Sequence, residues 1–114
     1  MEYSQAHLLA RAIKDSEEYQ TYHSLHDEVM SDATQAALIN EYKKLQMQLQ
    51  MAVMAGQSGS SDDMNRFSAL STLLFSKPEV QQYLLAEMRL QQALADIFKI
   101  ITDAADMDIR LPGM

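Results

Sequence analysis

Apolar residues recur at intervals of three and four along most of this chain, which is the period of an amphipathic α-helix. Between residues 38 and 54 they form two rows on one predicted helix. The first row consists of Leu38, Tyr42, Leu45, Leu49 and Ala52. The second row consists of Met47, Met51 and Met54. It lies roughly 200° around the axis from the first, because each residue turns a helix by about 100°. One apolar face is enough to pack a helix on its own domain, so the second face predicts a further contact.

Helix-capping residues divide the pattern into separate helices. A first helix is predicted from Ser4 to about Asp15. Ser16 then suits an N-cap, and Glu17 and Glu18 place negative charge in a first turn, where the helix dipole favours it. A second, short helix should therefore run to about residue 30.

Three further helices follow from similar signals. Asp32, with Gln35 three residues on, resembles a capping box and should begin the two-faced helix, which runs to about residue 55. Ser61 is predicted to cap a fourth helix. The apolar residues expected to face inward on that helix are Met64, Phe67, Leu70, Leu73 and Leu74. The segment Ser76-Lys77-Pro78-Glu79 should begin a fifth helix, because Pro is tolerated in a first turn. This last helix is predicted to be the longest and to reach about residue 105.

The composition favours helices throughout. The chain has three Gly and two Pro among 114 residues, and 47% of its residues are hydrophobic, which fits long uninterrupted helices better than many short strands. The predicted connections are short, including residues 56–61 (GQSGSS), so neighbouring helices should be antiparallel. The sequence predicts an all-α protein, an antiparallel helical bundle of about five helices with a long C-terminal helix, in a single domain over residues 1–114. The tail, about residues 106–114, is expected to be frayed.

Charge, hydropathy and cysteine content argue against several classes of function. Sixteen acidic residues against nine basic ones give a net charge of −7, which repels phosphate and disfavours direct binding of nucleic acid. No apolar run approaches the roughly 20 residues of a membrane span. The N-terminus does not resemble a signal peptide, so we expect a cytoplasmic location. The chain has no cysteine, which excludes disulfides, thiol catalysis and cysteine-ligated clusters, and no cofactor is expected.

Two segments on either side of a glutamine-rich middle helix resemble a known family. They are Leu9 to Tyr22 (LARAIKDSEEYQTY) and Val80 to Ile101 (VQQYLLAEMRLQQALADIFKII). Their most specific features are Ile13 followed by Ser16-Glu17-Glu18-Tyr19, and the Tyr83-Leu84 pair before Ala86-Glu87. In order and spacing, over nearly the whole chain, these features resemble the YlbF/YmcA-like family of small helical bacterial proteins.

This resemblance implies a cytoplasmic, non-enzymatic regulator that associates with itself and with related chains. Members of the family are linked to sporulation, competence and biofilm formation, and some act in a complex that modulates a membrane-associated ribonuclease. Members tied to iron–sulfur clusters use cysteines, which this chain lacks. The metal-cofactor role therefore does not carry over, and a regulatory role through protein contacts is the part of the resemblance that we retain.

A possible metal site lies on the second predicted helix. His23, His26 and Asp27 stand at i, i+3 and i+4, which places two imidazoles and one carboxylate on one face, a set that suits a divalent metal. A zinc site needs three or four protein ligands, and His7 would join only through the tertiary fold. Exposed histidines with Asp27 supporting His23 are the preferred interpretation, so these residues stay secondary candidates and no metal is expected.

Candidate catalytic groups have simpler explanations. Glu17, Glu18 and Glu28 are carboxylates that acid/base catalysis would use, and Ser16 is a hydroxyl that nucleophilic catalysis would use. Neither a nucleophile elbow nor a glycine-rich phosphate loop accompanies them. First-turn glutamates are already explained by the helix dipole. We therefore assign no catalytic residue and predict that the protein is not an enzyme.

The methionine row allows two interpretations. Met fills irregular gaps in cores, so the row is compatible with ordinary packing, for example beneath the last helix of the same chain. Met is also favoured on adaptable binding surfaces, and no residue from 45 to 61 is charged, as at the centre of an interface. The leading hypothesis is an interface formed by Met47, Met51, Met54 and Gln50, through which two copies associate as a two-fold dimer.

Two classes of function follow from this surface. The first is a regulatory adaptor that dimerises and binds a related chain or a ribonuclease-associated complex. The alternative is a chaperone-like module that holds an amphipathic client segment in a Met-lined groove. A third interpretation, a metal or small-ligand binder, depends on the histidines alone. Stoichiometric partners in a pull-down would favour the adaptor, and many substoichiometric clients would favour the chaperone.

Overall fold

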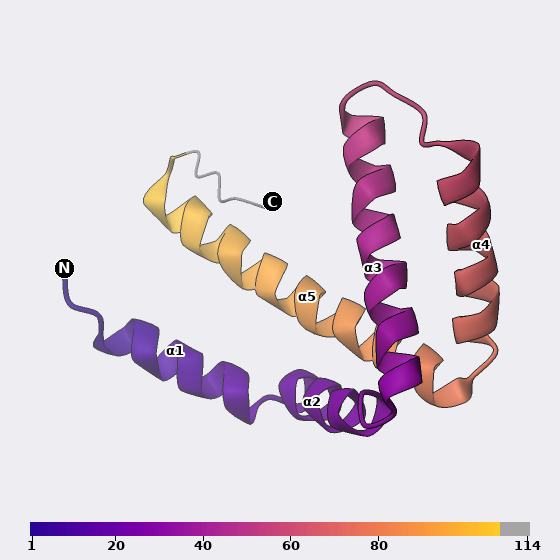
Figure 1. Ribbon diagram of the computed structural model, residues 1–114. Helices are drawn as coiled ribbons and strands as arrows, with labels where there is room; N and C mark the ends of the chain where they lie inside the picture. Colours follow the sequence, from indigo (N-terminus) through magenta and orange to yellow (C-terminus); the bar gives the residue numbers. More distant parts are fainter. Residues whose placement is uncertain (108–114) are drawn as a thin grey trace. The chain divides into compact units, whose positions relative to one another are not determined.

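The computed structural model describes residues 1–107, which form five α-helices (Figure 1). In chain order they are α1 (Ser4–Asp15), α2 (Glu17–Val29), α3 (Ala33–Met54), α4 (Ser61–Phe75) and α5 (Pro78–Ala105). No strand occurs in this range, and none of its helices has the length and apolarity needed to cross a membrane. The prediction of an all-α fold with a long C-terminal helix is confirmed. The predicted fraying of the tail falls mostly on residues 108–114, which lie outside the described residues.

Two of the predicted N-caps form as expected. The hydroxyl of Ser16 accepts a hydrogen bond from the backbone N–H of Tyr19 at 3.2 Å. The carboxylate of Asp32 accepts one from the N–H of Thr34 at 3.0 Å. Pro78 is the first residue of α5, where its missing N–H costs no helical hydrogen bond. Local chemistry therefore decides where three of the five helices begin.

Two capping predictions are wrong in detail. Gln35 does not complete a capping box, because its side-chain amide donates to the carbonyl of Val29 at 2.9 Å. The cap of α4 is Ser60, not Ser61: the Ser60 hydroxyl accepts from the N–H of Asp63 at 3.1 Å. The backbone of Ser60 is extended, whereas Ser61 is already helical. Both serines have the same capping hydroxyl, so the backbone conformation of the connection decides which of them is the N-cap.

The described chain forms two compact units. One consists of Met1–Tyr22 together with the chain from Leu85 onward, and the other is His23–Leu84. Helices α2 and α5 each contribute residues to both units. The expectation of a single domain over residues 1–114 stays a prediction.

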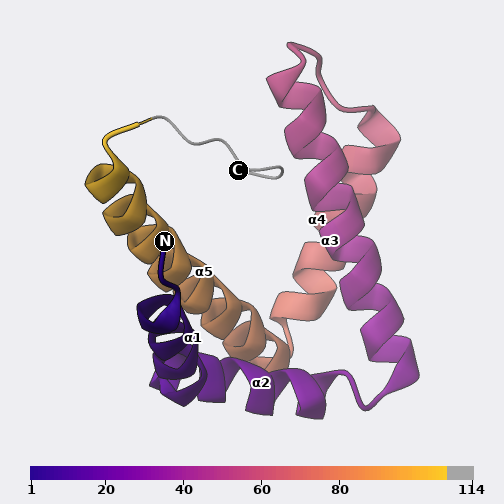
Figure 2. The same ribbon diagram turned by 90° about the vertical axis from the view of Figure 1, so that its left-hand side faces the viewer.

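The buried core lies in the unit His23–Leu84, where α3 and α4 run side by side and antiparallel (Figures 1 and 2). The ring of Tyr42 on α3 stacks on Phe67 of α4, with centroids 5.0 Å apart, and meets Phe75 edge-on at 6.2 Å. The buried residues of this unit are Val29, Gln35, Ile39, Tyr42, Leu45, Leu70, Leu74, Val80, Tyr83 and Leu84. Each large apolar side chain buried in this way stabilises the fold by about 1.5–3 kcal/mol.

Helix α4 buries fewer side chains than its apolar pattern predicted. Leu70 and Leu74 are buried and Phe67 is half-buried, but Met64 and Leu73 are 53% and 46% exposed. The prediction that Met64 and Leu73 face inward is wrong. The stripe on α4 that the core covers is narrow, and Leu73 lies about 100° around the helix from Leu74.

A polar cluster around Tyr83 joins three helices of the same unit. The ammonium of Lys43 on α3 donates to the Tyr83 hydroxyl of α5 at 2.9 Å and lies 5.0 Å from the centre of its ring. The imidazole of His26 on α2 lies 5.8 Å from that ring. Tyr83 is fully buried, and a buried hydroxyl needs such a partner because its desolvation is otherwise uncompensated.

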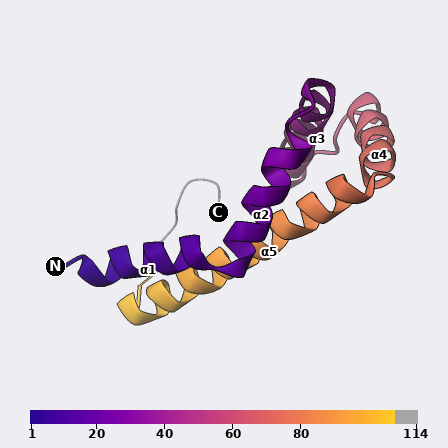
Figure 3. The same ribbon diagram turned by 90° about the horizontal axis from the view of Figure 1, so that it is seen from below.

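The other unit has almost no buried core. Helix α1 and the later part of α5 lie side by side (Figures 2 and 3). No residue of α1 is buried, and Ala86 is the one buried hydrophobic residue of α5 after Leu84 within the described range. The buried hydrophobic residues of α5, namely Val80, Tyr83, Leu84 and Ala86, therefore all lie near its start.

A glycine ends α3 in a tight turn. Gly56 has a φ of +75°. Its N–H donates to the carbonyl of Val53 at 3.0 Å, and the N–H of Gln57 donates to the carbonyl of Ala52 at 2.8 Å. These two bonds form a Schellman motif, which satisfies helix-end carbonyls and requires a left-handed residue. The motif turns the chain back so that Gly59 reaches Leu49 of α3.

Substitution of Gly56 tests this turn. We expect Gly56→Ala to lower the free energy of unfolding by about 1–2 kcal/mol, because a Cβ disfavours the left-handed backbone. Gly56→Asn should cost less, since Asn tolerates that conformation. Urea denaturation of both variants, with Ser58→Ala as a control in the same connection, measures the difference. Equal stabilities of the Ala and wild-type chains would contradict the assignment.

Candidate protein-binding surface

Helix α3 carries the two apolar rows, and the structure buries only one of them. In the first row Tyr42 and Leu45 are buried, while Leu38, Leu49 and Ala52 are half-buried. This face packs in the core of its unit. Tyr42 and Leu45 are accordingly unavailable to a partner, whereas the half-buried Leu49 also lines a groove on the surface.

The second row is exposed. Met47 and Met51 are each 63% exposed, Met54 is 85% exposed, and the neighbouring Gln50 is also exposed. We refer to these four residues as the Met surface. Core packing therefore does not account for the row: the methionine side chains lie largely in solvent. Their role as an interface stays a prediction.

A groove between α3 and α4 adjoins the Met surface. Its volume is about 520 Å³, and it is open along one side. The residues that line it are Gln46, Leu49, Gln50, Val53, Met54 and Phe67. Gln50 and Met54 belong to both features, so the groove and the Met surface form one continuous, mostly apolar area on the outside of the hairpin.

Charges border this area without entering it. No residue from 45 to 61 is charged. Toward the start of α3, Glu41 pairs with Arg66 of α4, and Lys44 is exposed. Beyond the connection, Asp62 and Asp63 occupy the first turn of α4. An uncharged apolar centre with charges at its rim is the usual composition of a protein–protein interface.

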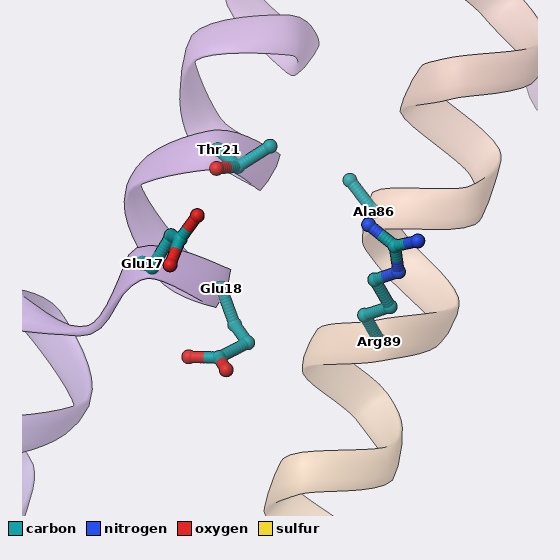
Figure 4. Close-up of a pocket in the computed structure, with 5 residues that line it drawn as sticks. All are labelled: Glu17, Glu18, Thr21, Ala86 and Arg89. Atoms are coloured by element: carbon teal, nitrogen blue, oxygen red, sulfur yellow. The ribbon is translucent and has the colours of Figure 1, made fainter.

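A second, smaller pocket lies in the unit that contains α1. It has a volume of about 210 Å³ and is lined by Glu17, Glu18, Thr21, Ala86 and Arg89. The two carboxylates project from α2 and the guanidinium from α5 (Figure 4). Both glutamates and the arginine are exposed. Glu17 and Glu18 lie in the first turn of α2, as the sequence predicted. The Thr21 hydroxyl is the one side-chain hydroxyl among the residues that line this pocket.

The histidines of α2 are placed by aromatic contacts. The rings of His23 and His26 meet edge-on with centroids 6.4 Å apart, and His26 also lies against Tyr83. The Nδ1 atom of His26 lies 3.5 Å from a carboxylate oxygen of Asp27. Asp27 therefore approaches His26, whereas the sequence had suggested that it supports His23. Within residues 1–107, no group of three His, Asp or Glu residues is arranged to hold a metal ion.

Four residues of the groove were not predicted as part of a site, namely Gln46, Leu49, Val53 and Phe67. Val53 is 71% exposed at the groove, and its position four residues after Leu49 was a signal that the sequence offered. Phe67 was expected to face inward; it is half-buried, stacks on Tyr42 of the core and also lines the groove. Its place depends on how α4 packs on α3, which no local pattern determines.

Fold and surface together define a small all-α protein with an uncharged, solvent-exposed apolar face on its third helix. The family model described as "Control of competence regulator ComK, YlbF/YmcA" matches residues 3–105. The chain belongs to this YlbF/YmcA family, which confirms the resemblance seen in the sequence.

Relatives of similar length support the assignment. A UPF0342 protein of Symbiobacterium thermophilum is 33% identical over 107 residues, which cover 94% of this chain and 96% of the relative. A UPF0342 protein of Caldicellulosiruptor saccharolyticus is 30% identical over 112 residues, covering 98% and 93%.

Two solved structures share the fold. A protein of unknown function (DUF964) from Bacillus stearothermophilus superimposes with a TM-score of 0.72 at 18% identity, covering 91% of each chain. Bacillus subtilis RicA, solved in complex with RicF, superimposes with a TM-score of 0.59 at 22% identity, covering 90% of this chain and 91% of that chain.

The metal interpretation of the histidines has a direct test. We expect zinc titrated into the protein to release no binding heat at micromolar concentration, because His23, His26 and Asp27 do not form a ligand set. Isothermal titration calorimetry measures this. A binding isotherm that disappears in a His23→Ala, His26→Ala double variant would contradict the expectation.

Proposed function

We propose that this protein is a non-enzymatic regulatory adaptor that acts through protein–protein contacts made by the Met surface and the adjoining groove. The observation that carries the proposal is the exposure of Met47, Met51 and Met54 on a helix whose opposite face is already buried. Large apolar side chains gathered on a surface mark interaction sites. Met is suited to such a site because its unbranched, polarisable side chain adapts to different partners.

The family supplies the class of partner. The model that matches this chain describes control of a competence regulator, and the RicA structure was determined with a protein partner, RicF. The partner we propose is a related family chain or a ribonuclease-associated complex, and the processes affected are developmental ones such as sporulation, competence and biofilm formation. The proposed location is the cytoplasm.

The groove also supports a second candidate function. An amphipathic helix of a client would fit an apolar channel lined by Leu49, Val53 and Phe67 in the manner of helix-in-groove recognition. This is the chaperone-like alternative. It differs from the adaptor in the number of different proteins bound. A client-binding groove accepts any segment with an amphipathic pattern, whereas an adaptor surface binds a particular protein.

A pull-down from the native cell tests the proposal. Tagged wild-type protein should retain one or two stoichiometric partners, including related family chains. Each methionine buried at an interface contributes up to about 1.5–3 kcal/mol, so the double variant Met47→Glu, Met51→Glu should weaken partner capture by at least about tenfold. Quantitative mass spectrometry of the retained chains measures the loss.

The matched control is Met88→Glu. Met88 is 65% exposed on α5, so it has the same residue type and nearly the same exposure as Met47, but it belongs to a different helix and to the other unit. This variant should capture partners as the wild type does. Equal capture by the Met47/Met51 variant would overturn the proposal, and many substoichiometric clients in place of one or two partners would replace it with the chaperone-like function.

A further inference from the structure

The Met surface gathers oxidisable side chains at one place. The chain has nine methionines and no cysteine, so its thioethers are the sulfur groups that a peroxide can oxidise. Met47 and Met51 are each 63% exposed, and Met54 is 85% exposed. Residues three and four apart are neighbours on a helix, and no other two methionines of the sequence have that spacing. The Met surface therefore places three neighbouring thioethers in solvent.

The fold does not depend on these thioethers. Met51 follows Tyr42 by nine residues, which is half a turn around α3 at about 100° per residue. Met47 and Met54 lie about 140° and 120° from Tyr42 by the same measure. Tyr42 and Leu45 are buried on the packed side of the helix. A polar group added to the methionines stays in solvent, so the free chain keeps its core.

Oxidation reverses the character of this surface. A sulfoxide replaces a flexible apolar side chain with a polar one, and this change disrupts interfaces that are rich in methionine. A partner that packs on thioethers offers apolar groups, which cannot donate to the new oxygen atoms. Burial of a polar group without a hydrogen bond is unfavourable. The oxidised surface therefore rejects the partner that the reduced surface binds.

Gln50 supports the oxidised form. It is exposed on α3, three residues after Met47 and four before Met54, so its side chain is a helical neighbour of both. Its amide has two N–H donors, which suit a sulfoxide oxygen at either position. No residue from 45 to 61 is charged. The oxidation state of the sulfur atoms thus sets how polar this surface is.

We propose that the Met surface is a reversible oxidation site, at which hydrogen peroxide converts Met47, Met51 and Met54 to sulfoxides and prevents the regulatory partner from binding. Each sulfur uses a lone pair to form an S–O bond while the O–O bond breaks, and after proton transfer the second oxygen leaves as water. Sulfur loses two electrons and peroxide gains them. This inference rests on the proposed function, because partner binding is what oxidation changes.

The reverse step restores the surface. Methionine sulfoxide reductases, one for each epimer, return the sulfoxide to the thioether. A dithiol supplies the two electrons and becomes a disulfide, and the sulfoxide oxygen leaves as water. A bound partner covers the sulfur atoms, so oxidation acts on the free chain and controls whether a new complex forms.

Peroxide treatment of the purified chain tests the inference. Peptide mass spectrometry measures sulfoxide at each methionine, and circular dichroism should show unchanged helical content. Capture of partners from the native cell should fall at least about tenfold, which is less than the apolar burial of one methionine contributes. Both reductases with a dithiol should restore capture.

The matched variant is Met47→Leu, Met51→Leu, Met54→Leu. Leucine keeps the surface apolar and has no sulfur, so this variant should capture partners as the wild type does, both before and after peroxide. Met64 and Met88, which are 53% and 65% exposed, stay oxidisable in it. Undiminished capture by the oxidised wild type overturns the inference. An equal loss in the Leu variant, or a loss of helix on oxidation, also overturns it.

Protection by the partner is a second measurement that needs no variant. In the captured complex, sulfoxide should form at Met47 and Met51 at least about tenfold more slowly than in the free chain, while the rate at Met88 is unchanged. Equal rates at Met47 and Met51 in the two states overturn the inference.

The inference and the proposed function fail in distinguishable ways. The proposed function is tested on the reduced chain with the Met47→Glu, Met51→Glu variant. If that variant captures partners as the wild type does, both are overturned. If it loses capture while the oxidised wild type keeps it, the proposed function stands and the inference alone is overturned.

Discussion

The packing of Tyr42 between Phe67 and Phe75 is the contact on which the hairpin of α3 and α4 depends. It fixes which side of α3 faces the core, and Ile39 and Leu45 are buried on that side. Because the Tyr42 side of α3 packs in the core, the opposite side of the helix faces solvent. The exposure of the methionine row is a consequence of this aromatic contact and of the pitch of the helix.

The turn after α3 keeps the outer area continuous. The Schellman motif at Gly56 ends the helix without a charged or bulky residue, and Gly59 approaches Leu49 so closely that an added Cβ would lie 2.3 Å from a Leu49 methyl carbon. The connection therefore packs against Leu49, one of the residues that line the groove. Small uncharged residues in this turn allow the chain to reverse direction and pass close to α3. They also keep charge away from the apolar area.

Burial is uneven along the described chain, and this unevenness fits the proposed function. The unit His23–Leu84 holds nearly all of the buried residues, including the Tyr83 hydroxyl with its Lys43 donor. The unit with α1 holds Ala86. A protein that acts by association can leave apolar faces open on its own, because the partner completes them. The Met surface lies in a segment without charge, which suits the proposed protein contacts.

The sequence alone determined the local properties of this chain. These are the helical periodicity, the caps at Ser16 and Asp32, the position of Pro78 at the start of α5 and the uncharged segment. The sequence also indicated the family. Only the tertiary structure decided that Ser60 caps α4, that Gln35 bonds to Val29, that Leu73 is exposed and that Phe67 lines a groove. The reason is physical: a helix is specified by hydrogen bonds and contacts within four residues, whereas burial depends on which distant segment arrives to cover each face.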